Sequence, residues 1–191
     1  MSSSLAPGFL IASPPLGDPN FDRTVVLLAV HNEDGALGFV VNRGMGITVG
    51  ELMGHVDYEG ASEDLSPVWR GGPCQPEIGW LLVDDPTLEG EGIIEVGERL
   101  RVSSSRALFD RFAEDLANKN PAAPRRMAVL GYSGWAPKQL ETEIATGAWL
   151  PTPLDLGILF DVAVDDRWER AFGLLGLTSL QMLSMRNIGQ A

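Results

Sequence analysis

Residues 131–149 have the sequence GYSGWAPKQLETEIATGAW, and this stretch says most about the fold of the chain. An apolar run ends at Leu130, and glycines follow it. Pro137 suits the first turn of a helix, where its missing N–H is not needed, and Leu140 and Ile144 then recur at helical spacing. The stretch therefore predicts a strand, a glycine-rich turn and a helix that opens on proline.

Polar side chains crowd this predicted strand–helix junction, where α/β proteins often place a site. A nucleophile elbow at Ser133 is disfavoured, because Trp135 stands where that motif needs glycine and both histidines precede the serine. Glu141 and Glu143 are two residues apart, so they cannot share a helix face and act as a catalytic carboxylate pair. The junction indicates a binding cleft more readily than a catalytic one.

Outside this stretch, apolar and β-branched runs predict strands at residues 8–12, 24–30, 36–41, 68–70, 78–83, 92–96, 100–102 and 127–130. The second and third of these are separated by a polar turn, which predicts an antiparallel hairpin. Thr48 is expected to cap a short helix, and Ser103 or Ser104 a longer one. A D-x-x-E pattern at 166–169 predicts another helix start. Strands followed by mixed helices predict an α+β fold.

Composition limits the class of protein. With 191 residues and 45% hydrophobic residues, the chain fits a single globular domain. No apolar run is long enough to span a bilayer, and the N-terminus lacks a signal-peptide pattern. Cys74 is the only cysteine, which fits a reducing cytoplasm. The 14 basic and 26 acidic residues give a net charge of −12, which disfavours direct nucleic-acid binding.

Other motifs give little evidence of cofactor chemistry. Gly44-Met45-Gly46 lacks the βαβ context of a dinucleotide loop. Two histidines and one cysteine without ligand spacing predict no metal site, and Cys74 is expected to be a buried, inert thiol. Arg70 followed by Gly71 and Gly72 could hold an anion through side-chain and backbone donors, although a simple turn is the alternative. The sequence predicts no cofactor.

Taken together, the segments resemble the AlgH/YqgE family of bacterial proteins over nearly the whole chain. The resemblance rests on Leu10-Ile11-Ala12 with Pro14, Asp18 to Phe21, Val25 to Leu28 with His31, Gly35-Ala36-x-Gly38 with Asn42, Gly71-Gly72-Pro73, Gly131-Tyr132-x-Gly134-Trp135 with Gln139-Leu140-Glu141 and Glu143, Gly147-x-Trp149, and Trp168-Glu169-x-Ala171. Gly44 and Cys74 depart from the family pattern, which usually has proline and an aliphatic residue at these positions.

The resemblance implies an α+β fold with a strongly bent, largely antiparallel sheet that forms a pseudo-barrel, with helices packed outside. It also implies a cytoplasmic bacterial protein. One branch of the family is tied by name to transcriptional control, yet the family pattern contains neither a DNA-binding motif nor an established catalytic residue. We expect residues 1–177 to form one AlgH/YqgE-like domain and residues 178–191 to form a C-terminal tail with at most a short helix.

The favoured hypothesis is a non-enzymatic regulatory protein that binds a small anionic or polar ligand or a protein partner, without contacting nucleic acid or membrane. The sequence leaves its oligomeric state open. We expect a cleft in which an arginine and glycine amides hold the polar group and aromatic rings cover it. Its predicted residues are His31, Asn42, Arg70, Gly71, Gly72, Tyr132, Trp135 and Gln139. The alternative is a small-molecule hydrolase or transferase with His31 as general base.

Overall fold

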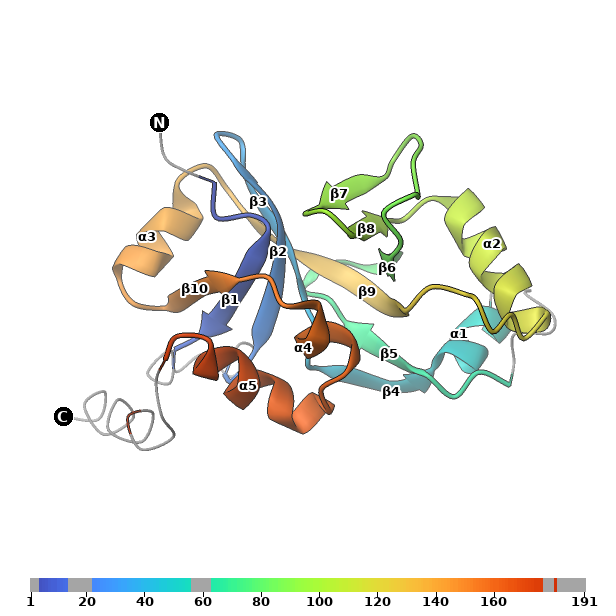
Figure 1. Ribbon diagram of the computed structural model, residues 1–191. Helices are drawn as coiled ribbons and strands as arrows, with labels where there is room; N and C mark the ends of the chain where they lie inside the picture. The colour runs from blue at the N-terminus through green and yellow to red at the C-terminus, as the bar shows by residue number, and fades with distance from the viewer. Residues whose placement is uncertain (1–3, 14–21, 56–62, 177–180, 182–191) are drawn as a thin grey trace. The chain divides into compact units, whose positions relative to one another are not determined.

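The computed structural model describes residues 4–13, 22–55, 63–176 and 181 (Figure 1). The chain divides into two compact units, and each is described by itself. The first unit contains residues 1–42 and 133–191, and the second contains residues 43–132. The predicted boundary at 177 and the tail at 178–191 concern residues that, apart from 181, lie outside the described part of the chain.

The first unit contains an antiparallel sheet with strand order β10–β1–β2–β3–β9. These strands are β1 (Gly8–Ala12), β2 (Val25–Asn32), β3 (Gly35–Val40), β10 (Trp149–Pro153) and the last three residues of β9 (Arg126–Trp135). The register of β2 against β3 shifts between Leu28 and Val30, and such a bulge bends a sheet. The hairpin predicted from the sequence is confirmed.

Helices α3 (Gln139–Ala145), α4 (Leu156–Phe160) and α5 (Arg167–Gly173), with the 3-10 turn η1 (Val164–Asp166), belong to the same unit. Two side chains fix α5 to the strands. The indole of Trp168 donates a hydrogen bond to the carbonyl of Ala12 at 3.2 Å, and Arg167 donates to the carbonyl of Val41. Burial lowers the pKa of Arg167 to about 10, so this guanidinium is held inside the fold by carbonyl acceptors.

The sheet of the second unit is built around the first part of β9. Strand β5 (Pro67–Arg70) pairs with β9 in parallel and with β4 (Gly44–Thr48) in antiparallel. On the other side β6 (Cys74–Asp84), β8 (Leu100–Ser103) and β7 (Ile94–Val96) follow in antiparallel order. Helices α1 (Val49–His55) and α2 (Arg106–Ala117) complete the unit. The α+β class and the largely antiparallel pairing are confirmed.

The apolar core of the second unit forms where α1 and α2 pack against these strands. α2 contributes Leu108, Phe112 and Ala113, all at most 8% exposed, which form one apolar stripe along the helix. β6 and β9 contribute the residues that face this stripe: Leu81, Val83 and Ala128. This packing places α2 beside β6 and so creates the wall of the site described below.

Residues 131–135 form a strand, where the sequence predicted a glycine-rich turn. Gly131 has φ +71°, and a Cβ atom on it would stand 2.7 Å from the carbonyl oxygen of Gly72. This left-handed position therefore needs glycine, while the strand continues to Trp135. Pro137 lies before α3, and Lys138 (φ +67°) is the N-cap, so the expected helix start at proline is wrong by two residues.

The predicted helix caps were partly right. Thr48 and Glu51 exchange hydrogen bonds as a capping box, because the Glu51 carboxylate accepts from the Thr48 N–H at 2.7 Å and the Glu51 N–H donates to the Thr48 hydroxyl at 3.2 Å. Ser105, rather than Ser103 or Ser104, caps α2. The helix start predicted from the D-x-x-E pattern is confirmed, because α5 begins at Arg167 with Asp166 as its N-cap residue, but the Asp166 side chain makes no capping bond.

Candidate functional site

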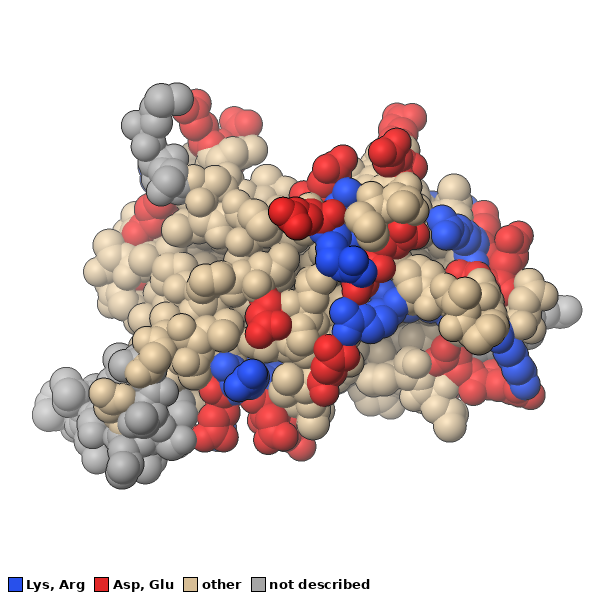
Figure 2. All heavy atoms as spheres, in the orientation of Figure 1, with Lys and Arg blue, Asp and Glu red and all other residues tan. Residues whose placement is uncertain are grey.

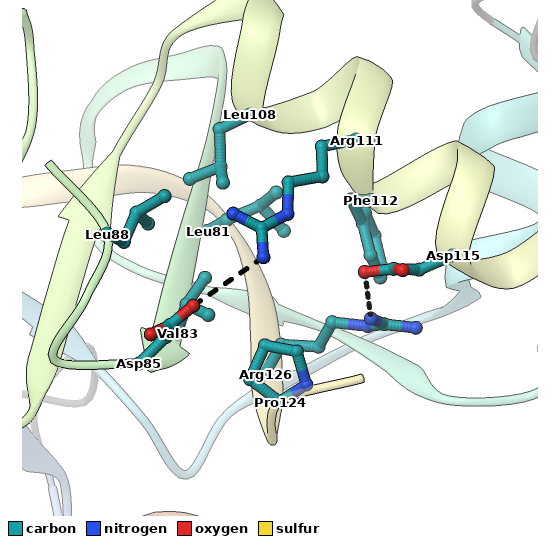
Figure 3. Close-up of a pocket in the computed structure, with 10 residues that line it drawn as sticks. All are labelled: Leu81, Val83, Asp85, Leu88, Leu108, Arg111, Phe112, Asp115, Pro124 and Arg126. Atoms are coloured by element: carbon teal, nitrogen blue, oxygen red, sulfur yellow. Dashed lines mark hydrogen bonds and ion pairs between the residues drawn. The ribbon is translucent and has the colours of Figure 1, made fainter. Parts of the chain in front are cut away.

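A small pocket opens between β6 and α2 in the second unit (Figure 3). It is a small hollow, partly open to solvent, and well below the enclosed volumes usual for drug-sized ligand pockets. Buried apolar side chains from the core form its floor, and two ion pairs stand at its mouth. Its lining residues are Leu81, Val83, Asp85, Leu88, Leu108, Arg111, Phe112, Asp115, Pro124 and Arg126.

The residues of the two ion pairs come from three different segments and line the same pocket (Figure 3). Arg111 on α2 stands 3.6 Å from the Asp85 carboxylate, which lies just beyond the end of β6. Arg126 at the start of β9 stands 3.4 Å from Asp115 near the end of α2. The guanidinium of Arg126 also lies over the Phe112 ring, 4.5 Å from its centroid, a cation–π contact.

The carboxylates at the mouth already have close partners. Oδ1 of Asp85 accepts from the backbone N–H and the hydroxyl of Thr87 at 2.9 and 2.6 Å, and Oδ2 faces Arg111. The hydrogen bonds from Thr87 hold the pKa of Asp85 below its ordinary value, against the opposing effect of burial. Oδ1 of Asp115 accepts from the Asn120 amide at 2.9 Å. These acceptors are engaged by the protein itself.

The guanidinium groups, by contrast, keep unused donor capacity. A guanidinium carries five N–H donors. Arg111 is 54% exposed, and its 3.6 Å contact with Asp85 is longer than a hydrogen bond. Arg126 makes one long hydrogen bond of 3.4 Å within the described residues. Burial lowers the pKa of Arg126, which reflects a cation that is incompletely compensated for its desolvation.

A second charged cluster lies at the same end of β6. The Asp84 carboxylate, 3% exposed, accepts from Arg99 at 2.8 Å and from two nitrogens of Arg125 at 3.1 and 2.8 Å. Burial raises the pKa of Asp84, but the hydrogen bonds from Arg125 and Arg99 outweigh that effect, and the pKa lies below its ordinary value. Basic side chains thus stand among acidic ones over the strands of this unit (Figure 2).

In the first unit, residues 135–149 form a hydrogen-bonded hub around Glu143. One carboxylate oxygen accepts from the indoles of both Trp135 and Trp149 at 2.8 Å, and the other accepts from the Gln139 amide at 2.8 Å. Trp135 is 7% exposed and packs edge-on against Trp149. These indoles and this amide therefore hold α3 against the sheet.

His31 lies on β2 with its side chain only 5% exposed. Its Nδ1 accepts a hydrogen bond from the Leu5 backbone N–H at 3.0 Å, so the neutral ring carries its proton on Nε2. Nε2 stands 3.6 Å from the Glu141 carboxylate and has no hydrogen-bond partner among the residues that the structure describes. Because the one lone pair of the neutral ring is already occupied, this geometry disfavours His31 as a general base.

The eight predicted cleft residues fall in both units, four in each. In the first unit His31, Trp135 and Gln139 come together near α3, since His31 pairs with Ala36 and Ala36 with Trp135 across neighbouring strands. Asn42 lies beyond the other end of β3. There its side-chain amide bonds to the backbone of Val25 and Arg23, which joins the end of β3 to the start of β2.

The other four residues gather around Gly131 in the second unit. The N–H of Gly71 donates to the Leu130 carbonyl at 2.8 Å, so it is not directed at a ligand. Tyr132 pairs with Cys74 and meets the Trp80 ring edge-on, while Arg70 is exposed. Cys74 is a free, half-buried thiol, so the expectation of a buried one was wrong.

The pocket between β6 and α2 was not predicted from the sequence. Arg111 and Asp115 are four residues apart on α2, which places both at the border of its apolar stripe. That spacing, together with the adjacent basic residues Arg125 and Arg126, was the only sequence pattern that could have indicated a charged site here. In the described part of the chain, no group of three His, Cys, Asp or Glu side chains could hold a metal ion, and no helix has the length and apolar character needed to cross a membrane.

Comparison with known proteins gives consistent matches. The AlgH-like family pattern matches residues 9–179. A UPF0301 protein of Anaeromyxobacter dehalogenans is 45% identical over 182 residues, which cover 92% of this chain and 90% of that protein. A UPF0301 protein of Nitrosococcus oceani is 39% identical over 171 residues, covering 88% of each chain.

Two solved structures share the fold. The solution structure of AlgH from Pseudomonas aeruginosa has a TM-score of 0.76 and 34% identity, and it covers 96% of this chain and 95% of that one. The crystal structure of DIP2367 from Corynebacterium diphtheriae has a TM-score of 0.71 at 18% identity, covering 96% and 92%. The chain is thus an α+β protein with a curled, largely antiparallel sheet. It belongs to the AlgH-like family.

Proposed function

We propose that this chain is a non-enzymatic binding protein of the bacterial cytoplasm that takes a small ligand in the pocket between β6 and α2. A regulatory or adaptor role without direct nucleic-acid contact is part of the proposal. The observation that carries it is the pocket itself, whose floor of Leu81, Val83 and Phe112 is at most 5% exposed. A buried apolar floor under a charged rim is the usual composition of a ligand site.

The alternative, a hydrolase or transferase with His31 as general base, has less support. His31 accepts the Leu5 N–H, and its other nitrogen faces Glu141. Proton abstraction requires a lone pair within reach of a substrate. The eight-residue cleft expected from the sequence stays a prediction, and the engagement of Trp135, Gln139, Asn42 and Gly71 in internal hydrogen bonds gives it less support than the pocket.

A neutral apolar probe tests the proposal. We expect 4-methylpentanamide, titrated into the ¹⁵N-labelled protein, to shift the backbone resonances of residues that line the pocket and to be recovered unhydrolysed. Leu88→Trp should abolish these shifts, because Leu88 is a half-buried side chain of the pocket wall that an indole would extend into the cavity. Ile78→Trp is the matched control, since Ile78 is 36% exposed and lies outside the pocket.

Shifts that are absent, or that scatter over both units and persist in Leu88→Trp, would contradict the pocket as the binding site. Hydrolysis of the amide that is lost in the same variant would contradict the non-enzymatic assignment.

A further inference from the structure

We infer that the pocket between β6 and α2 selects small monocarboxylates with a branched or compact apolar body, and that Arg111 and Arg126 hold the carboxylate. This inference rests on the proposed function and specifies the chemical class of its ligand. The apolar body would rest on the floor of the pocket, and the two carboxylate oxygens would face the mouth, where the guanidiniums stand (Figure 3).

The mouth of the pocket has more hydrogen-bond donors than acceptors left for a ligand. Asp85 and Asp115 each have one oxygen engaged by a neighbouring Thr87 or Asn120 and the other facing an arginine. Arg111 and Arg126 together contribute one hydrogen bond of 3.4 Å within the described residues. The mouth therefore has unused N–H donors but few unused acceptors. A ligand with two acceptor oxygens, such as a carboxylate, complements these donors.

Arg111 is also more accessible to a ligand than the carboxylate it pairs with. Arg111 is 54% exposed while its partner Asp85 is 14% exposed, so an incoming group meets the cation first. A cationic ligand would need the two carboxylates instead, and Asp85 is shielded and already bonded. The long contact of 3.6 Å also means that Arg111 gives up little when it turns toward a ligand.

Arg111 comes from α2 and Arg126 from β9, yet both guanidiniums face the space above Val83 and Phe112 (Figure 3). Planar forks of this kind bind carboxylates with two parallel hydrogen bonds. The pocket is small and partly open to solvent, so a ligand with a short, compact apolar body fits it better than a long acyl chain.

The test compares two isosteres in the full chain at constant pH 7 and constant salt. We expect 4-methylpentanoate to bind about tenfold more tightly than 4-methylpentanamide, because charge-assisted hydrogen bonds are roughly twice as strong as neutral ones. The preference is informative because the net charge of −12 repels the acid from the protein as a whole. Arg111→Gln should reduce the preference to about threefold or less, and Arg111→Lys should restore part of it.

Arg106→Gln is the matched control. Arg106 also lies on α2, is 74% exposed and pairs with Asp110 four residues on, but it does not line the pocket. It should leave the acid-to-amide preference unchanged. Circular dichroism of each variant would report whether α2 is intact, so that lost binding is not confused with lost structure.

The outcomes separate this inference from the proposed function. Equal affinity for acid and amide, with both mapped to the pocket, would overturn the carboxylate assignment and leave the pocket as a binding site. A tenfold preference that persists in both Arg111→Gln and Arg126→Gln would overturn the role of these arginines. If neither probe perturbs the pocket residues, the proposed function fails together with the inference.

Discussion

At the scale of single residues, Glu143 shows how one carboxylate stabilises the segment that identifies the family. Three donors from Trp135, Trp149 and Gln139 converge on its two oxygens, each at 2.8 Å. Hydrogen bonds to charged groups contribute more than neutral ones. The two tryptophans are therefore positioned by hydrogen bonds to Glu143 as well as by packing. The spacing of Trp135, Glu143 and Trp149 in the sequence allows both bonds.

We predict that Glu143→Gln lowers the free energy of unfolding by about 2 kcal/mol, because glutamine offers one acceptor oxygen and directs its NH₂ group at a donor. Urea unfolding followed by circular dichroism would measure the change. Glu141→Gln on the same helix is the control, expected to cost less than about 1 kcal/mol, since the ion pairs of Glu141 with His31 and Lys138 are long, at 3.6 and 3.7 Å. Equal losses in the two variants would contradict a special role for Glu143.

Asp84 leads to a prediction about pH. Its folded pKa lies below the ordinary 3.8 because bonds from Arg125 and Arg99 outweigh desolvation. The stabilisation is therefore fully present above that ordinary value and is lost as pH falls through the lower folded pKa. We expect Asp84→Asn to cost about 2–4 kcal/mol at pH 7, and the difference from the unsubstituted chain to shrink as pH falls below about 4. Urea unfolding at pH 7, 5, 4 and 3 measures it, and a constant difference would refute this account.

At the scale of secondary-structure elements, the start of α2 depends on Ser105. Its hydroxyl accepts from the Leu108 N–H at 3.4 Å, and its own N–H donates to the Ser103 hydroxyl at 3.0 Å. We expect Ser105→Ala to destabilise the fold by about 0.5–1 kcal/mol, at the lower end for a lost cap because the bond is long. Ser104→Ala, an exposed neighbour, should change little. Thermal unfolding of both variants tests this, and a larger loss in Ser104→Ala would reassign the cap.

The element scale also shows what sequence patterns can and cannot predict. The capping box at Thr48 and Glu51 is complete within four residues, so local chemistry was sufficient. The three consecutive serines before α2 did not show which one caps the helix. Ser103 lies in β8, where it pairs with Leu81, and that pairing is not visible from the local sequence. Residues 131–135 form a strand because partners far away in sequence pair with them, at Ala36 to Gly38 and at Cys74. Glycine there permits close approach and does not end the strand.

At the scale of the whole molecule, the α+β class was predictable and the pocket was not. Strand and helix types follow from local periodicity, whereas the pocket joins Asp85 to Arg111 and Asp115 to Arg126 through the packing of α2 on β6 and β9. The sequence also assigned functional roles to Trp135 and Gln139, whose polar groups are engaged in the Glu143 hub. The polar residues of the 131–149 motif thus stabilise the fold, whereas the charged residues of the candidate site come from segments that match no motif.

The central claim is that the pocket between β6 and α2 is a ligand site. A crystal structure of the protein soaked with 4-methylpentanoate at a saturating concentration tests it most directly. The account predicts density for the acid over Leu81, Val83 and Phe112, with its carboxylate within hydrogen-bond distance of Arg111 and Arg126. An empty pocket, or density with the carboxylate turned away from both arginines, would contradict it.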